Sequence, residues 1–214
     1  MPIAILHREE SFVVCCKPVG LSSEGPGLPQ LLAEELGERE VFCVHRLDTA
    51  VGGVMVYALS KAAAASLSRQ VAQRTLDKTY LAVCASCPEQ PEGEMNDLLF
   101  KDARSNRSYV VNRPRKGVKD AKLDYRVLAR AEDCSLVRVH LHTGRTHQIR
   151  VQFASRQLPL LGDGKYGSRH KGCPIALWSH QLCFDHPVSG QSLCFSALPG
   201  EGYPWDLFRE VLHA

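Results

Sequence analysis

The stretch VFCVHRLDTAVGGVMVYA, Val41–Ala58, contains two short apolar runs separated by a polar segment. The runs at residues 41–44 and 54–58 are short and rich in residues that favour strands, so we predict two buried strands joined by a turn. Gly52 and Gly53 stand just before the second run. Glycine lets the backbone take a positive φ or approach a ligand closely at such a place.

The polar residues between these strands place a carboxylate on a turn. His45, Arg46 and Asp48 all lie in this segment. A carboxylate on a turn between buried strands is rigidly held yet accessible, which suits a nucleophile or a general base. The alternative interpretation is an Asp that caps the turn, and both remain open at this point.

Composition indicates an ordinary globular protein. The chain has 214 residues, of which 44% are hydrophobic and 23% charged, and no segment is both long and apolar enough to span a membrane. A domain of this size buries about 70% of its unfolded surface. Met1–Glu10 lacks the basic region and long apolar run of a secretory signal, so we expect a cytoplasmic location.

The cysteines favour a reducing compartment. Their number, nine, is odd, and Cys84 and Cys87 have the spacing of half a zinc site, but no second pair with suitable spacing follows. His140 and His142 lie in a different predicted element, so no metal is expected. Other cysteines lie in apolar, strand-like runs, where we interpret them as small apolar side chains. They are Cys15, Cys16, Cys43, Cys134, Cys183 and Cys194.

Positive charge is concentrated in one region, although the net charge is only +3. This imbalance favours a phosphate-bearing partner, and the alternative is a solvated loop and strand face. Between positions 101 and 130 only Asp102, Asp120 and Asp124 oppose the basic residues Lys101, Arg104, Arg107, Arg113, Arg115, Lys116, Lys119, Lys122, Arg126 and Arg130.

The periodicity of apolar residues, together with the positions of Gly and Pro, predicts an α+β fold with a largely antiparallel sheet. Residues 142–155 predict a helix opened by a Thr/Gly turn, with Arg145 near its N-terminus and Thr146 and Arg150 on one face. A linker is expected around residues 88–91. Other expected helices lie at 28–36, 60–74 and 205–212, and strands at 3–6, 12–16, 77–84, 108–111, 123–128, 134–141, 175–184 and 192–196.

Three polar blocks resemble those of the RluA class of pseudouridine synthases. They are His45-Arg-Leu-Asp48, Lys78-Thr-Tyr80 and Thr143-Gly-Arg-Thr-His-Gln-Ile-Arg150, of which the third is the most specific. The resemblance spans nearly the whole chain. Three further blocks match in the same order, namely Lys17-Pro-Val-Gly-Leu21, Leu161-Gly-Asp-Gly-Lys-Tyr-Gly167 and His186-Pro-Val-Ser-Gly190.

The resemblance implies a single catalytic domain over residues 1–214, without the extra N-terminal S4 RNA-binding domain that many members carry. It implies a mixed, mainly antiparallel sheet flanked by helices, with a catalytic cleft across the sheet. The expected reaction isomerises specific uridines of ribosomal or transfer RNA to pseudouridine by base flipping. No cofactor, metal or membrane is expected to take part, and the chain is expected to act as a monomer.

The resemblance also implies roles for individual residues. Asp48 matches the catalytic aspartate, and its route, by attack on the ribose, attack on the base or removal of a ribose proton, remains open. Tyr80 matches the tyrosine that stacks on the extruded uracil. Arg150 matches the arginine that pairs with the aspartate and keeps it ionised. The residues expected to bind substrate are Arg46, which fills the gap left by the flipped nucleotide, His45, Arg145, Thr146 and Lys78.

Two positions depart from the family pattern. Val51-Gly-Gly53 replaces Thr-Ser-Gly, so hydroxyls that order the catalytic turn are missing, and Gln152 replaces a histidine. The first departure motivates an alternative function, a non-catalytic RNA-binding protein or RNA chaperone on the same scaffold. His45 is interpreted as a structural turn residue rather than an acid or base. A hydrolase using His45 with Asp48 is less consistent with the sequence, since no nucleophile elbow accompanies them.

Overall fold

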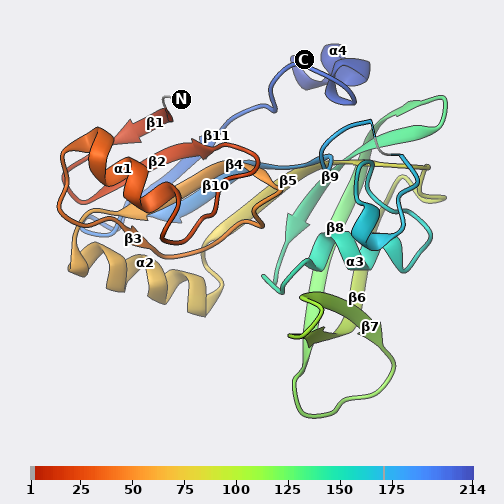
Figure 1. The fold of residues 1–214 in the computed structure, drawn as a ribbon, viewed down its shortest axis with the longest axis horizontal. Coiled ribbons are helices and arrows are strands. Elements are labelled where there is room, and N and C mark those ends of the chain that lie inside the picture. The colour runs from red at the N-terminus through yellow and green to blue at the C-terminus, as the bar shows by residue number, and fades with distance from the viewer. Residues whose placement is uncertain (1–2, 171) are drawn as a thin grey trace. The chain divides into compact units, whose positions relative to one another are not determined.

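The computed structural model describes residues 3–170 and 172–214 (Figure 1). The chain divides into two compact units: residues up to Lys78 with Trp178–Pro199 form unit 1, and Thr79–Leu177 with Gly200–Ala214 form unit 2. The structure defines each unit by itself, so the single domain over residues 1–214 stays a prediction. No helix within the described ranges is long and apolar enough to cross a membrane.

Unit 1 contains a mixed sheet. Its strand order is β1-β2-β4-β10, with β3 added on β4 and β11 on β10. The β4–β10 pair is parallel, whereas β1–β2, β2–β4, β3–β4 and β10–β11 are antiparallel. The bounds are β1 Ala4–Arg8, β2 Phe12–Lys17, β3 Phe42–Cys43, β4 Gly52–Ala58, β10 Leu177–Asp185 and β11 Ser192–Ser196.

Two helices complete unit 1, and both follow from local signals. Helix α1 (Leu28–Leu36) ends at Gly37, which is left-handed with φ 70° and donates its N–H to the carbonyl of Ala33. Helix α2 (Lys61–Gln73) begins after Ser60, whose side chain accepts the N–H of Ala63. The α2 face with Ala63 and Leu67 packs on a core that includes Phe12, Val54, Val56 and Leu182 of the sheet.

Unit 2 contains an antiparallel sheet in the order β5-β9-β8-β6-β7. Helix α3 (Gln148–Ala154) packs on it, and Val151 of the helix joins Leu99, Ala121 and Tyr166 in one buried cluster. The mainly antiparallel α+β fold is thereby confirmed. The other elements are β5 Asp77–Cys84, β6 Glu92–Asp102, β7 Arg107–Val111, β8 Val118–Ala131, β9 Cys134–Leu141, η1 Gly164–Tyr166, η2 Trp205–Phe208 and α4 Arg209–Leu212.

Several sequence expectations were wrong in unit 2. Strand β6 was missed, because only Met95 and Leu99 of it are fully buried and its remaining residues do not alternate between apolar and polar. Strand β8 is much longer than the expected 123–128, because its polar first half pairs with β6. The expected helix at 205–212 is a 3-10 turn followed by a single α-helical turn.

Cys183 and Cys194 differ from the expectation of free thiols. They lie directly opposite each other in the antiparallel β10–β11 pair, with a Cα–Cα distance of 4.1 Å, and form a disulfide. The two cysteines occupy separate strands, so sequence spacing alone did not reveal their pairing. Cys15, Cys16, Cys43 and Cys134 are free, as expected.

Candidate active site

The backbone on both sides of Asp48 is held by hydrogen bonds within unit 1. On one side, the hydroxyl of Ser23 donates to the carbonyl of Leu47 at 2.9 Å and accepts the N–H of Leu47 at 3.0 Å. On the other side, the carbonyl of Thr49 accepts the N–H of Gly20 at 2.8 Å. The carbonyl of Asp48 itself accepts the N–H of Val51 at 2.9 Å. This turn is therefore fixed without side-chain hydroxyls at positions 51 and 52.

The buried side chain of Lys17 supports the same turn. The side chain is fully buried, and its ammonium donates to the carbonyls of Pro18, Leu21 and Thr49 at 2.9, 2.7 and 3.2 Å. Burial lowers the pKa of Lys17 to about 8, an effect that the carboxylate of Asp48 partly opposes. The Lys17-Pro-Val-Gly-Leu21 block thus contacts the Asp48 turn through one ammonium group.

Gly52 and Gly53 belong to β4 rather than to the turn, and both allow a close approach of β10. Gly53 has φ 121°, and a Cβ there would lie 2.6 Å from the backbone nitrogen of Ser179. A Cβ on Gly52 would lie 2.5 Å from the ring of Trp178. The predicted positive φ and close approach are confirmed for Gly53, but the neighbour is a strand. The departure at position 52 is therefore explained by packing against Trp178, whereas Gly53 matches the family pattern.

We expect Gly53→Ala to destabilise the protein clearly more than Gly190→Ala does. Both glycines have positive φ, at 121° and 74°, but a Cβ on Gly190 meets nothing within 4 Å. The control should therefore lose about 1 kcal/mol from backbone strain alone, whereas Gly53→Ala adds the clash with Ser179. Urea denaturation of the two variants measures the difference. Equal losses would show that β10 adjusts to the added methyl group.

His45 is a buried residue with a structural contact. Its Nε2 accepts the N–H of Val56 in β4 at 3.2 Å, which requires the unprotonated nitrogen. Burial, with Lys78 nearby, holds the pKa of His45 well below its usual value. These features favour the structural role over acid–base chemistry. Arg46 is exposed instead, and its guanidinium lies 3.2 Å from Glu24 in a surface ion pair.

Tyr80 and Lys78 lie on β5, and the predicted strand 77–84 is confirmed. Tyr80 is 6% exposed and pairs in register with Val139 of β9. Lys78 is half-buried, and burial lowers the pKa of its ammonium to about 8. A lysine at such a pKa is partly neutral near physiological pH.

Arg150 is buried in unit 2, where it forms a bidentate ion pair. Its Nε and Nη2 lie 2.7 and 2.9 Å from the two carboxylate oxygens of Asp163, and both side chains are buried. The guanidinium carbon also lies 5.2 Å from the centre of the Tyr166 ring. The Tyr166 hydroxyl accepts the N–H of Ser108 at 2.8 Å and lies 2.9 Å from Nδ1 of His147. Arg150 is therefore fixed in its orientation.

The helix that carries Arg150 begins later than expected. It starts at Gln148, and His147 before it is left-handed with φ 54°. The side-chain oxygen of Gln148 accepts bonds from the Thr143 hydroxyl and the Arg145 N–H, which keeps residues 143–147 as a loop. Arg145 and Thr146 thus precede the helix, so the shared helical face of Thr146 and Arg150 was wrong.

Gln152, the second departure, ties α3 to the sheet of unit 2. Its side-chain nitrogen donates to the carbonyl of Met95 at 3.1 Å and to the carboxylate of Asp97 at 2.7 Å. The side chain is fully buried. Gln152 therefore supports the helix that carries Arg150.

Comparison with known proteins decides the family. The sequence profile described as RNA pseudouridylate synthase matches residues 11–155. The chain belongs to this family. It is therefore an isomerase that modifies RNA, and the residues matched include the Asp48 turn, β5 and α3.

Bacterial relatives agree with this assignment, and a solved structure has the same fold. The dual-specificity RNA pseudouridine synthases RluA of Pasteurella multocida and Escherichia coli are each 34% identical, over 91% of this chain and 92% of theirs. Human RNA pseudouridylate synthase domain containing 4 is 24% identical, with a TM-score of 0.79, over 98% of this chain and 92% of that one. The similarity to this human structure supports the fold described above.

Sequence reasoning missed three supporting residues of this pseudouridine synthase. Ser23 and Asp163 hold the segments that carry Asp48 and Arg150, and Tyr166 stacks beside Arg150. Asp163 and Tyr166 belong to the Leu161–Gly167 block, which was identified only by its resemblance to the family. Ser23 lies just after the Lys17–Leu21 block. The predicted pairing of Arg150 with Asp48 would join the two units, and it stays a prediction.

Proposed function

We propose that this enzyme isomerises specific uridines of ribosomal or transfer RNA, with Asp48 as the catalytic carboxylate and the target uridine flipped out of its stack. The observation that carries the proposal is the Asp48 turn, whose backbone is held by the Ser23 hydroxyl on one side and by the Gly20 N–H and the buried ammonium of Lys17 on the other. Rigid support of this kind suits a group that must meet a substrate atom in one geometry.

The chemistry requires a carboxylate and no outside reactant. The bond between N1 and the ribose breaks, the base turns over, and C5 bonds to the ribose while the C5 proton leaves and N1 gains a proton. A carboxylate that bonds and leaves again divides this change into easier steps. We assign Tyr80 to stacking on the extruded uracil and to accepting the C5 proton, and Arg150 to keeping the carboxylate ionised.

Arg46 is suited to the place vacated by the flipped nucleotide. Its side chain is exposed, and its ion pair with Glu24 is a surface contact worth about 1 kcal/mol or less. Such a pair opens at small cost when RNA binds. We place Lys78, Arg145 and Thr146 among the substrate contacts, with His45 as a structural residue that supports β4. A monomeric state and a cytoplasmic location stay predictions.

Nucleoside analysis of separate RNA pools tests the substrate. Unmodified ribosomal and transfer RNA are each incubated with the purified enzyme, digested and analysed for pseudouridine. We expect pseudouridine to appear in at least one pool, and in both if this chain shares the dual specificity in the relatives' name. Tight binding without product in either pool would favour the RNA chaperone. That alternative is weakened because packing against the Trp178 ring explains the glycine at position 52.

The loop between β7 and β8 is the proposed phosphate contact. Arg113, Arg115 and Lys116 are exposed there, and Arg115 lies over the Phe100 ring at 4.6 Å. We expect charge reversal of all three to weaken RNA binding. Each phosphate contact that is lost reduces the number of counterions released when RNA binds. The magnitude of the slope of log K against log salt should therefore fall by about 0.7–0.9 per contact. Binding titrations at several salt concentrations measure this slope.

A matched control separates this loop from a general charge effect. Reversal of Lys61, Arg69 and Arg74, which are exposed on and beside α2, changes the net charge by the same amount. We expect this variant to retain more of the salt slope. Equal slopes in the two variants, or an unchanged slope in the loop variant, would contradict the proposed contact.

A further inference from the structure

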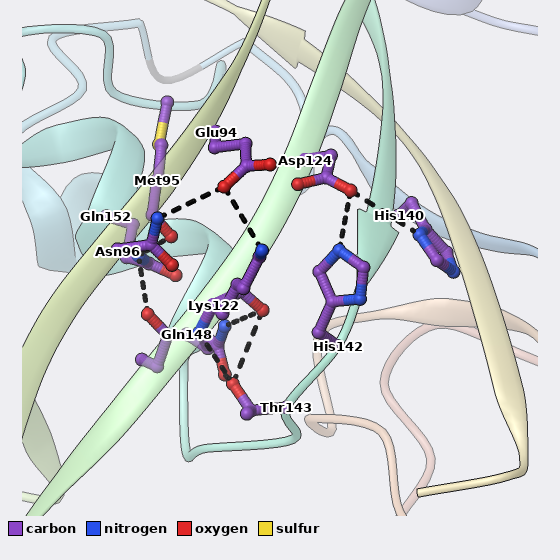
Figure 2. A network of polar contacts seen from close by, with 11 residues as sticks. Glu94, Met95, Asn96, Lys122, Asp124, His140, His142, Thr143, Gln148 and Gln152 are labelled. Atoms are coloured by element: carbon purple, nitrogen blue, oxygen red, sulfur yellow. Dashed lines mark hydrogen bonds and ion pairs between the residues drawn. The ribbon is translucent and has the colours of Figure 1, made fainter.

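Two histidines and an aspartate meet on strands β8 and β9 of unit 2. Asp124 lies on β8, His140 on β9, and His142 directly after β9 (Figure 2). None of the three has a role in the proposed uridine chemistry. We propose that Asp124, His140 and His142 form a binding site for a divalent transition-metal ion of the Zn²⁺ type.

The register of the strands explains why these side chains converge. Asp124 and His140 are directly opposed in the antiparallel β8–β9 pair, so their side chains leave the same face of the sheet. His142 follows His140 by two positions, which returns it to that face. The three groups thus come from fixed strand positions, and a metal would not need to order a loop around itself.

Their donor atoms already lie at distances close to those of a coordination sphere. One donor atom from each residue lies within 4.8 Å of the other two. Nε2 of His142 is 2.5 Å from Oδ2 of Asp124, and Nδ1 of His140 is 3.8 Å from the same oxygen. Donor atoms around a tetrahedral Zn²⁺ are about 3.3 Å apart at bond lengths near 2.0–2.1 Å. The two distances to Oδ2 of Asp124 lie on either side of that spacing.

The second oxygen of Asp124 points to the same conclusion. Oδ1 is buried and accepts no hydrogen bond from the described part of the chain. A buried carboxylate oxygen without a donor is costly, and coordination to a cation is one way to satisfy it. Both imidazoles instead face Oδ2, as Figure 2 shows, so the contacts of this carboxylate are made on one oxygen.

Carboxylates offset the basic side chains on this face of the sheet. Lys122 stands two positions before Asp124 on β8, and its ammonium is held by Glu94 at 3.1 Å (Figure 2). Arg126, two positions after Asp124, lies 4.0 Å from Glu92 and stands opposite Arg138 of β9. With neutral imidazoles the charges of this face balance, so the attraction for an incoming ion comes from the carboxylate of Asp124 itself.

The donor set selects the kind of metal. Two imidazole nitrogens and one carboxylate oxygen suit Zn²⁺, Ni²⁺ and Co²⁺ better than Mg²⁺ or Ca²⁺, which prefer oxygen ligands. Three protein ligands leave a fourth position for water. The inference departs from the expectation of no metal, which considered these histidines only as partners of Cys84 and Cys87.

Titration of the reduced, chelator-treated protein with Zn²⁺ tests the site. We expect calorimetry to detect one equivalent of Zn²⁺ bound, and the melting temperature to rise by about 5 °C or more when free Zn²⁺ exceeds the dissociation constant a hundredfold. Asp124→Asn and His142→Ala should each weaken this binding about tenfold or more. The control His213→Ala, at an exposed histidine near the C-terminus, should bind like the wild type.

Cobalt distinguishes this site from the cysteines. Co²⁺ bound by two imidazoles and a carboxylate gives visible bands without a thiolate charge-transfer band. A thiolate band that disappears in Cys87→Ser would assign the metal to Cys84 and Cys87 and overturn the proposal. Absence of saturable binding, or binding unchanged in both Asp124→Asn and His142→Ala, would overturn it equally. Circular dichroism shows that each variant is folded, and none of these readouts depends on isomerase activity.

Discussion

Asp48→Asn is expected to abolish pseudouridine formation while RNA affinity stays within a few-fold of the wild type. The amide keeps the shape of the side chain but removes the charge and the nucleophilic oxygen, so the single-turnover rate should fall by a factor on the order of 10⁴ or more. The turn should persist, because Ser23 and Lys17 hold Leu47 and Thr49 through backbone carbonyls. Single-turnover assays and binding titrations on one RNA measure the two quantities.

A matched substitution controls for the loss of one charge. Asp185→Asn makes the same change at an exposed position at the end of β10, also in unit 1, and should leave both turnover and affinity unchanged. Equal unfolding midpoints for the two variants would show that Asp48→Asn is correctly folded. Turnover retained in Asp48→Asn would assign the chemistry to another group and refute the proposed mechanism.

Asp163→Asn is expected to lower the free energy of unfolding by about 3–5 kcal/mol. Asp163 is 1% exposed and binds the buried guanidinium of Arg150 through both carboxylate oxygens. Removing one partner of a buried ion pair leaves the other charge without its compensation, which is strongly destabilising. Urea denaturation followed by circular dichroism measures the loss. Misplacement of Arg150 should also slow turnover.

An exposed ion pair gives the comparison. Glu38 lies 2.9 Å from Arg8, and both side chains are substantially exposed. Glu38→Gln should therefore cost about 1 kcal/mol or less, because solvent screens such a pair. Similar small losses in Glu38→Gln and Asp163→Asn would show that the Arg150–Asp163 pair contributes little to the fold.

Local patterns predicted the elements whose signals lie within a few residues. Gly37 ended α1 where expected, and β5 took the predicted bounds because its last five residues form a continuous apolar run that is buried. Strand β6 lacked such a signal, since its pairing with β7 and β8 supplies the stability that its own pattern does not show. Such cross-strand support is set by the tertiary fold and has no local signature.

The contacts that support the candidate site were not predicted, although the sequence names the residues expected at its centre. Asp48, Tyr80 and Arg150 were named from three short blocks, but their partners lie elsewhere in the chain. Ser23 bonds to a residue 24 positions away, and Asp163 lies 13 positions after Arg150. The start of α3 was misplaced because His147 takes a left-handed conformation and the Gln148 side chain holds the preceding loop through the N–H of Arg145.

Tritium release from RNA labelled at uracil C5 tests the central claim most directly. The RNA is taken from cells that lack this gene, so that its target uridines are unmodified, and it is incubated with the purified wild type and with Asp48→Asn. Isomerisation replaces the C5 hydrogen, so we predict that the wild type releases tritium and that Asp48→Asn does not. Binding of this RNA by the wild type without tritium release would contradict the proposed isomerisation at Asp48.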